Sequence, residues 1–79
     1  MILLEKILDV TSKVIKVPVS QLSKKSSMGD PPNWDSVSHV LIIVEMESVF
    51  DVSFEFDELE HLVSIQAIVD SLNKKGIND

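Results

Sequence analysis

The sequence contains no cysteine, which excludes a disulfide framework and a thiolate metal site. Its two histidines, His39 and His61, are too few and too far apart for a zinc site. No apolar run approaches the roughly 20 residues that span a bilayer, so we expect no membrane segment. Residues 1–4 lack the basic region and small-residue cleavage site of a signal peptide. We therefore expect a cytoplasmic protein.

Basic residues are absent from the central part of the chain. Residues 30–73 contain ten acidic residues and no lysine or arginine, whereas residues 1–29 contain five lysines, and the net charge of the whole chain is −6. An acidic surface repels phosphates, so we expect no nucleic-acid partner. It suits a basic partner protein that binds and dissociates quickly. The competing interpretation is that the acidic residues only maintain solubility.

The length and the apolar spacing predict one small all-α domain over residues 1–79. A core of this size is marginal, which favours helices with short connections. Apolar residues at spacings of three and four predict a first helix over residues 2–16. Val17-Pro18 ends it, because the residue before proline disfavours helical geometry. Residues 17–35 then form a long first loop without regular structure, for which we expect four apolar anchors: Val17, Val19, Leu22 and Met28.

Two more main helices and one short helix complete the predicted bundle. The second helix is expected over residues 36–51, followed by a link with apolar anchors at Val52, Phe54 and Phe56. One helical turn is expected over residues 57–61. Ser64 is expected to cap a last helix over residues 65–75, and Gly76 to stop it.

The second predicted helix has apolar residues on two opposite sides. At 100° per residue, one side contains His39, Ile42, Ile43, Met46, Val49 and Phe50. The other side contains Val37, Val40, Leu41 and Val44. Either this helix is central and wrapped on all sides, or the second side binds a partner. With three or four helices full wrapping is difficult, so we favour a partner-binding surface.

Ser36 lies where a helix begins, after a loop with Gly29, Pro31 and Pro32. Asp35 is a good N-cap, because its carboxylate can accept hydrogen bonds from amides of the first turn. The first turn also presents free N–H groups and the positive end of the helix dipole. A phosphodiester on Ser36 would be favoured there.

The segment Asn33-Trp34-Asp35-Ser36-Val37 resembles the phosphopantetheine attachment site of acyl carrier proteins. The resemblance covers almost the whole chain, including the long first loop, Val49-Phe50-Asp51, and the segment from Leu62 to Asp70. A literal Asp-Ser-Leu also occurs at residues 70–72, but it lies inside the last predicted helix with no loop before it. Position therefore selects Ser36 rather than Ser71.

The resemblance implies a carrier rather than an enzyme. A phosphopantetheinyl transferase would attach 4'-phosphopantetheine from coenzyme A to Ser36, and the thiol of this arm would hold an acyl or aminoacyl group as a thioester. Other implied partners are loading enzymes and downstream enzymes of a biosynthetic pathway, and we expect a monomer. Asp35 would act as the helix cap and contact the transferase. Trp34 is expected first of all to anchor the loop. The expected partner-binding residues are Trp34, Val37, Val40, Leu41, Val44, Glu45 and Glu47.

Of three departures from the family pattern, the one at Val37 is conservative, and the other two point to a dedicated pathway rather than general fatty-acid synthesis. Val37 replaces the usual leucine, and Trp34 stands where many fatty-acid carriers have a small residue. Leu41 and Ser48 occupy positions where the housekeeping carrier commonly has acidic recognition residues. The alternative function is an unmodified helical interaction module, an adaptor or regulator. An enzyme is disfavoured because no catalytic set can be assembled: His39 is expected to be a half-buried packing residue and His61 a surface residue.

Overall fold

The first helix turns its apolar side toward the centre of the molecule. In the computed structural model, which describes residues 2–78, α1 spans Ile2–Ile15. Its buried residues follow the expected spacing of three and four: Leu3, Ile7, Val10, Thr11 and Ile15. The Thr11 hydroxyl donates to the Ile7 carbonyl at 2.9 Å, which satisfies this buried polar group. Lys16 has a φ of 59°, and this left-handed residue ends α1 one residue before the predicted limit.

The long loop is more ordered than the sequence predicted. A short 3-10 helix, η1, spans Val19–Gln21, and Ser27 forms isolated β-bridges with Asp30 and Ser64. Of the four expected apolar anchors, Val17 and Leu22 are buried, but Val19 and Met28 are 43% and 41% exposed. The loop is held there by its backbone instead, since the Met28 N–H donates to the Val63 carbonyl at 2.8 Å. The predictions of an irregular loop and of four side-chain anchors were therefore wrong in part.

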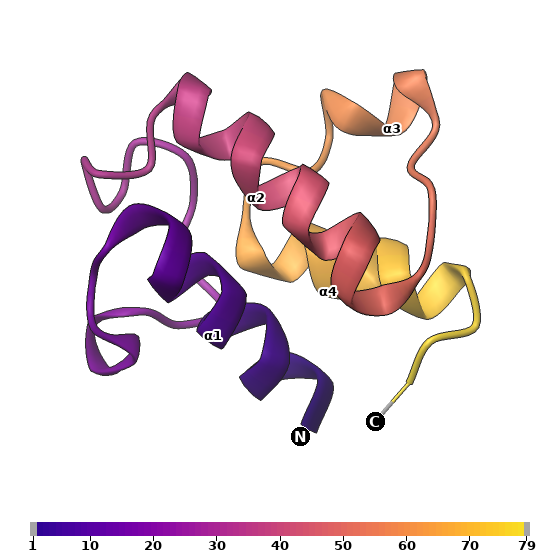
Figure 1. Ribbon diagram of the computed structural model, residues 1–79, viewed down its shortest axis with the longest axis horizontal. Helices are drawn as coiled ribbons and strands as arrows, with labels where there is room; N and C mark the ends of the chain where they lie inside the picture. The colour runs from indigo at the N-terminus through magenta and orange to yellow at the C-terminus, as the bar shows by residue number, and fades with distance from the viewer. Residues whose placement is uncertain (1, 79) are drawn as a thin grey trace.

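Helix α2 spans Ser36–Phe50 and begins at the predicted residue. Asp35 is its N-cap, and Asp51 ends it one residue early by adopting a left-handed conformation with a φ of 53°. Figure 1 shows α2 running antiparallel to α1. The loop joins the two helices at one end, where the Asn33 side-chain amide donates to the Ile15 carbonyl at 3.2 Å.

The short helix α3 spans Phe56–Leu59 and is shifted from the predicted turn at residues 57–61. The shift follows from a capping box, in which the side chains of Glu55 and Glu58 each accept a hydrogen bond from the other's backbone N–H. The expectation that Phe56 anchors this segment was wrong, because its side chain is 90% exposed. Phe54 supplies the anchor and is buried, while Val52 packs against the core from a half-buried position.

Helix α4 spans Ile65–Lys74 and closes the bundle. Ser64 caps it as predicted, accepting the Ala67 N–H at 3.1 Å, and Gly76 adopts a φ of 88° just after its end. The predicted inner face is buried: Ile65, Ile68, Val69 and Leu72. Helix α1 packs against both α2 and α4, so the three longer helices enclose one core (Figure 1). None of the helices within residues 2–78 combines the length and hydropathy required to cross a membrane.

Candidate functional site

Ser36 is the first residue of α2, and its side chain is exposed to solvent. The loop before it is closed by two backbone hydrogen bonds: Gly29 N–H donates to the Trp34 carbonyl at 2.7 Å, and Trp34 N–H donates to the Pro31 carbonyl at 3.0 Å. The Ser36 hydroxyl is therefore presented on a fixed segment, at the end of the helix where the dipole favours negative charge.

Trp34 fixes this segment from the inside. Its side chain is 0% exposed, and its indole N–H donates to Nδ1 of His39 at 3.1 Å. The two rings are stacked with centroids 5.9 Å apart. This burial agrees with the expected role of Trp34 as an anchor of the loop, and it contradicts the alternative in which the ring contacts partner proteins. Burial lowers the pKa of His39, as expected for a half-buried packing residue.

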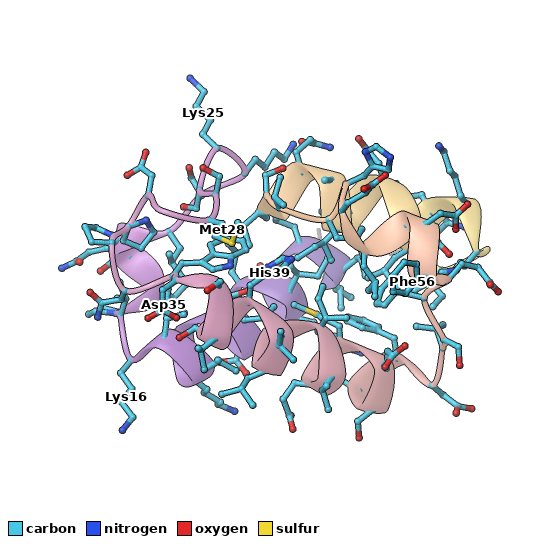
Figure 2. All side chains as sticks on the ribbon, turned by 90° about the horizontal axis from the view of Figure 1, so that it is seen from above. Lys16, Lys25, Met28, Asp35, His39 and Phe56 are labelled. Atoms are coloured by element: carbon cyan, nitrogen blue, oxygen red, sulfur yellow. The ribbon has the colours of Figure 1, made fainter. Side chains whose placement is uncertain are left out.

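Asp35 caps the helix rather than acting as a base. Its carboxylate accepts the Ser38 N–H at 2.8 Å, and this hydrogen bond, followed by one from the Ser38 side chain, lowers the pKa of Asp35. The group therefore remains ionised near neutral pH. Figure 2 shows Asp35 at the start of α2 and His39 turned toward the other helices.

Ser71, the serine of the second Asp-Ser-Leu, has a different environment. It lies within α4, is 9% exposed, and its hydroxyl donates to the Glu58 carboxylate at 2.9 Å. A group attached there would have to break this hydrogen bond and displace the packing around α4. The two environments therefore agree with the choice of Ser36 over Ser71, which rested on position in the chain.

The outward side of α2 is apolar next to Ser36. Four side chains there are more than half exposed: Val37 at 70%, Val40 at 60%, Leu41 at 53% and Val44 at 55%. We call these four residues the α2 strip. The opposite side is buried through Ile42, Ile43 and Met46. Val49 was predicted to belong to the buried side, but it is 47% exposed and lies at the border between α2 and α1.

The two glutamates expected to contact partners differ in their surroundings. Glu45 is exposed and stands at the border between α2 and α1. Glu47 is half-buried, and its carboxylate accepts the Phe54 N–H at 2.9 Å. Glu47 therefore also holds the segment after α2 in place, a role that its sequence position did not indicate.

Glu58 organises a polar cluster that the sequence interpretation missed. Its carboxylate accepts hydrogen bonds from the Lys75 ammonium, the Glu55 N–H and the Ser71 hydroxyl, each at 2.9 Å. The bond from Lys75 is the main reason that the pKa of Glu58 falls from 4.5 to about 2. Ser71 lies on α4 and Lys75 directly follows its last residue, and their spacing of four residues was the signal in the sequence that could have placed them on one side. In the part of the chain that the structure describes, no group of three histidine or acidic side chains is arranged to hold a metal ion.

Three curated relatives named acyl carrier protein align with nearly the whole chain. The protein from Chlorobium phaeobacteroides (strain DSM 266 / SMG 266 / 2430) is 30% identical over 71 residues, covering 90% of this chain and 91% of that protein. The one from Buchnera aphidicola subsp. Schizaphis graminum (strain Sg) is 28% identical over 72 residues, 91% of each chain. The one from Amoebophilus asiaticus (strain 5a2) is 25% identical over 71 residues, 90% of this chain and 89% of that protein. No protein-family model matches the chain.

Proposed function

This chain belongs to the acyl carrier protein family, and we propose that it carries acyl or aminoacyl groups on a 4'-phosphopantetheine arm attached to the hydroxyl oxygen of Ser36. The observation that supports this proposal best is the contrast between the two serines. Ser36 is exposed on the first turn of a capped helix, whereas Ser71 is buried and hydrogen-bonded within α4.

The residues around Ser36 are compatible with an attached 4'-phosphopantetheine arm. The arm begins with a phosphodiester, and the N-terminal end of α2 favours a negative charge at that position. The buried Trp34 and the backbone hydrogen bonds of residues 29–34 keep the Ser36 hydroxyl exposed to solvent, where a transferase can approach it. When attached, the arm supplies a thiol that can hold an acyl group as a thioester.

The carrier itself contributes position rather than chemistry. Neither Asp35, which is occupied as a cap, nor His39, whose Nδ1 accepts the indole N–H of Trp34, is placed to act as a base for Ser36. Attachment therefore depends on a phosphopantetheinyl transferase. The protein's own task is to keep the tethered group at a high effective concentration near a docked enzyme.

We assign the docking of the transferase and of pathway enzymes to the α2 strip together with Glu45. The strip lies directly beside Ser36 and leaves four apolar side chains in solvent, which is unusual for a small monomer unless they bind something. Glu47 is exposed only in part and contributes less. Because Leu41 and Ser48 are uncharged, this surface is less acidic than that of the housekeeping carrier, which favours a dedicated pathway.

The test is attachment of the arm in vitro. The purified protein is incubated with coenzyme A and a broad-specificity transferase, and the intact mass and the modified peptide are measured. We expect one added phosphopantetheine on the peptide that contains Ser36. Ser36→Ala should abolish the mass increase and Ser71→Ala should retain it. No added mass would favour the unmodified interaction module instead, and modification at Ser71 would overturn the assignment to Ser36.

A further inference from the structure

The side chains of Trp34 and His39 are in contact on either side of Ser36 in the sequence. The indole N–H of Trp34 donates to Nδ1 of His39 at 3.1 Å, and the two rings are stacked with an angle of 26° between their planes. Trp34 belongs to the loop and His39 to α2, so this contact joins two elements. Figure 2 shows His39 turned toward the other helices, whereas Ser36 is exposed to solvent. The loop is therefore fixed to α2 from the inside, at the segment that carries Ser36 on the outside.

The other hydrogen bonds described around Ser36 are local to one element. The Asp35 carboxylate accepts the Ser38 N–H at 2.8 Å, and the Asp35 carbonyl accepts the His39 N–H at 2.9 Å. Both belong to the cap and first turn of α2 and move with that helix. The backbone hydrogen bonds of Trp34 remain within the loop. Among the residues that the structure describes, the bond between the Trp34 and His39 side chains is thus the one that links the buried part of the loop to α2.

The orientation of the Ser36 hydroxyl depends on how the loop enters α2. Ser36 is the first residue of the helix, so any rotation of the preceding residues relative to the helix changes where its hydroxyl points. The Trp34 ring is 0% exposed and cannot turn without displacing its neighbours in a close-packed core. The polar atom of this ring finds its acceptor on α2 itself. The ring and the start of the helix therefore have one preferred relative orientation, which His39 maintains.

We propose that His39 is a positioning residue for attachment of the phosphopantetheine arm, and that it acts through Trp34 to hold the Ser36 hydroxyl in the orientation that a transferase requires. This inference rests on the proposed function and adds His39 to it. His39 is half-buried and turned inward, so it is not part of the α2 strip on which the transferase is expected to dock. Its effect should therefore appear in the rate of attachment within the docked complex and not in the affinity of docking.

The attachment step is sensitive to the position of a single oxygen atom. The Ser36 oxygen forms a bond to the phosphorus that carries the pantetheine group. The bond between this phosphorus and the adenosine 3',5'-bisphosphate leaving group breaks, and the hydroxyl proton goes to a base of the transferase. A displacement of about 1 Å in such a reacting group can slow a reaction about 100-fold. Losing the contact that orients the start of α2 should therefore lower the rate even when the helix remains folded.

The experiment measures attachment to the intact protein in a single turnover, with coenzyme A and a broad-specificity transferase both in excess. Asparagine and leucine have nearly the same shape, but only asparagine places an acceptor oxygen near the position of Nδ1. We expect His39→Leu to lower the maximal rate constant about tenfold and His39→Asn to remain within about twofold of the unaltered protein. The transferase concentration at half the maximal rate should change little, because the α2 strip is unaltered. Equal maximal rates for all three proteins, equal slowing of both variants, or a change in the half-maximal concentration alone would overturn the proposal.

A variant of the core separates orientation from stability. Leu72 is fully buried in α4, so Leu72→Val destabilises the fold while leaving every atom of the Trp34–His39 bond unchanged. We expect this variant to unfold at a lower temperature and to retain the maximal rate constant of the unaltered protein. If Leu72→Val slows attachment as much as His39→Leu does, stability and not orientation controls the rate, and the proposal is wrong.

The other partner of the bond provides a second test. Trp34→Phe keeps an aromatic ring and removes the N–H, so it should slow attachment by itself, and His39→Leu added to it should slow attachment no further. An additional loss of rate in the double variant would overturn the proposal. If His39→Leu does not fold by circular dichroism, Trp34→Phe alone has to show the loss. Absence of the arm on Ser36 in the unaltered protein would instead contradict the proposed function, and intact mass separates that result from a slow variant.

Discussion

The indole N–H of Trp34 donates to Nδ1 of His39 at 3.1 Å, which joins the residue two positions before Ser36 to the first turn of α2. Since an indole N–H can only donate, Nδ1 must be unprotonated, and the neutral ring carries its proton on Nε2. Nε2 is buried, and no hydrogen-bond partner for it lies among residues 2–78. Protonation of His39 would add a second donor and remove the acceptor that Trp34 requires.

We predict that His39→Leu destabilises the protein more than His39→Asn. Leucine leaves the indole N–H of a fully buried tryptophan without an acceptor, which costs about 1–3 kcal/mol of unfolding free energy. The side-chain oxygen of asparagine can replace Nδ1 and recover part of that loss. Urea denaturation at pH 7.5 measures the difference. Equal destabilisation by the two variants would show that the lost ring packing, not the hydrogen bond, determines the effect.

The hydrogen bond between Trp34 and His39 should also make the free energy of unfolding depend on pH. Burial lowers the pKa of His39 below its ordinary 6.5, so the unfolded chain binds this proton more readily than the folded one. Neutral His39 contributes fully to the free energy of unfolding above pH 6.5. This contribution is lost as the pH falls through the lower pKa of the folded state. Unfolding free energies measured between pH 7.5 and 5 should therefore decline more steeply in the unaltered protein than in His39→Asn. His61→Asn, which alters an exposed histidine, is the control and should follow the unaltered protein.

Glu58 is predicted to stabilise the contact between α3 and α4 at neutral pH. Its pKa is lowered from 4.5 to about 2, chiefly by the Lys75 ammonium, so its contribution is complete above pH 4.5 and declines as the pH falls toward 2. Because the carboxylate side chain is 28% exposed, solvent screening reduces its contribution to about 1 kcal/mol. Glu58→Gln should lose this amount at pH 7, and the loss should shrink toward pH 3. Glu60→Gln, whose side chain is 76% exposed, is the control; a similar loss there would show that the cluster around Glu58 has no special role.

The helix starts were predictable because they depend on local chemistry. Asp35 and Ser64 cap α2 and α4 as expected, since a short oxygen-bearing side chain before an apolar periodic run satisfies first-turn amides wherever the helix later packs. The ends of α1, α2 and α4 were predicted to within one residue. The ends of α1 and α2 are set by the left-handed residues Lys16 and Asp51, which helical periodicity does not identify.

The errors that bear most on the site concern which side chains are buried. Trp34 is buried and anchors the loop, as expected, and its indole donates to His39 five residues later, so the partner contact also expected of it is not available. Phe56 was expected to be buried and is exposed, because the capping box of Glu55 and Glu58 sets where α3 begins. Val49 lies at the boundary between two faces of α2. Its burial depends on how closely α1 approaches, which no local pattern specifies.

We predict that Val40→Asp weakens docking to the transferase without unfolding the protein. Val40 is 60% exposed, so the change should alter the unfolding free energy by no more than about 0.5 kcal/mol. Loss of an apolar contact near the centre of a docked surface should weaken binding about tenfold. Ile43→Asp is the matched control within the core and should unfold the domain, because it buries an unpaired charge. Circular dichroism measures whether each variant is folded, and a binding assay measures its affinity for the transferase. If both variants unfold equally, the α2 strip is part of the core.

The last prediction is that the loaded protein is a poor substrate for the condensing enzymes of general fatty-acid synthesis. Leu41 and Ser48 are uncharged and exposed on α2, whereas Trp34 is buried and does not affect the approach of an enzyme. Fewer negative charges on this surface reduce electrostatic steering toward basic enzyme patches, so the defect should lie in KM rather than in kcat. Efficient turnover of the unaltered protein by these enzymes would contradict a dedicated pathway.

Restoring the two charges should repair part of the defect. Leu41→Glu combined with Ser48→Glu adds two surface ion pairs with a basic partner, worth about 1 kcal/mol together at low salt, which corresponds to a KM about fivefold lower. Because exposed charges are screened within about 10 Å at 0.1 M ionic strength, the gain should diminish as salt is raised. Leu41→Gln with Ser48→Gln is the control: it removes the same apolar contact from Leu41 without adding charge. If the glutamine pair lowers KM as much as the glutamate pair, the loss of apolar surface and not the charge is responsible, and the electrostatic explanation for partner choice is wrong.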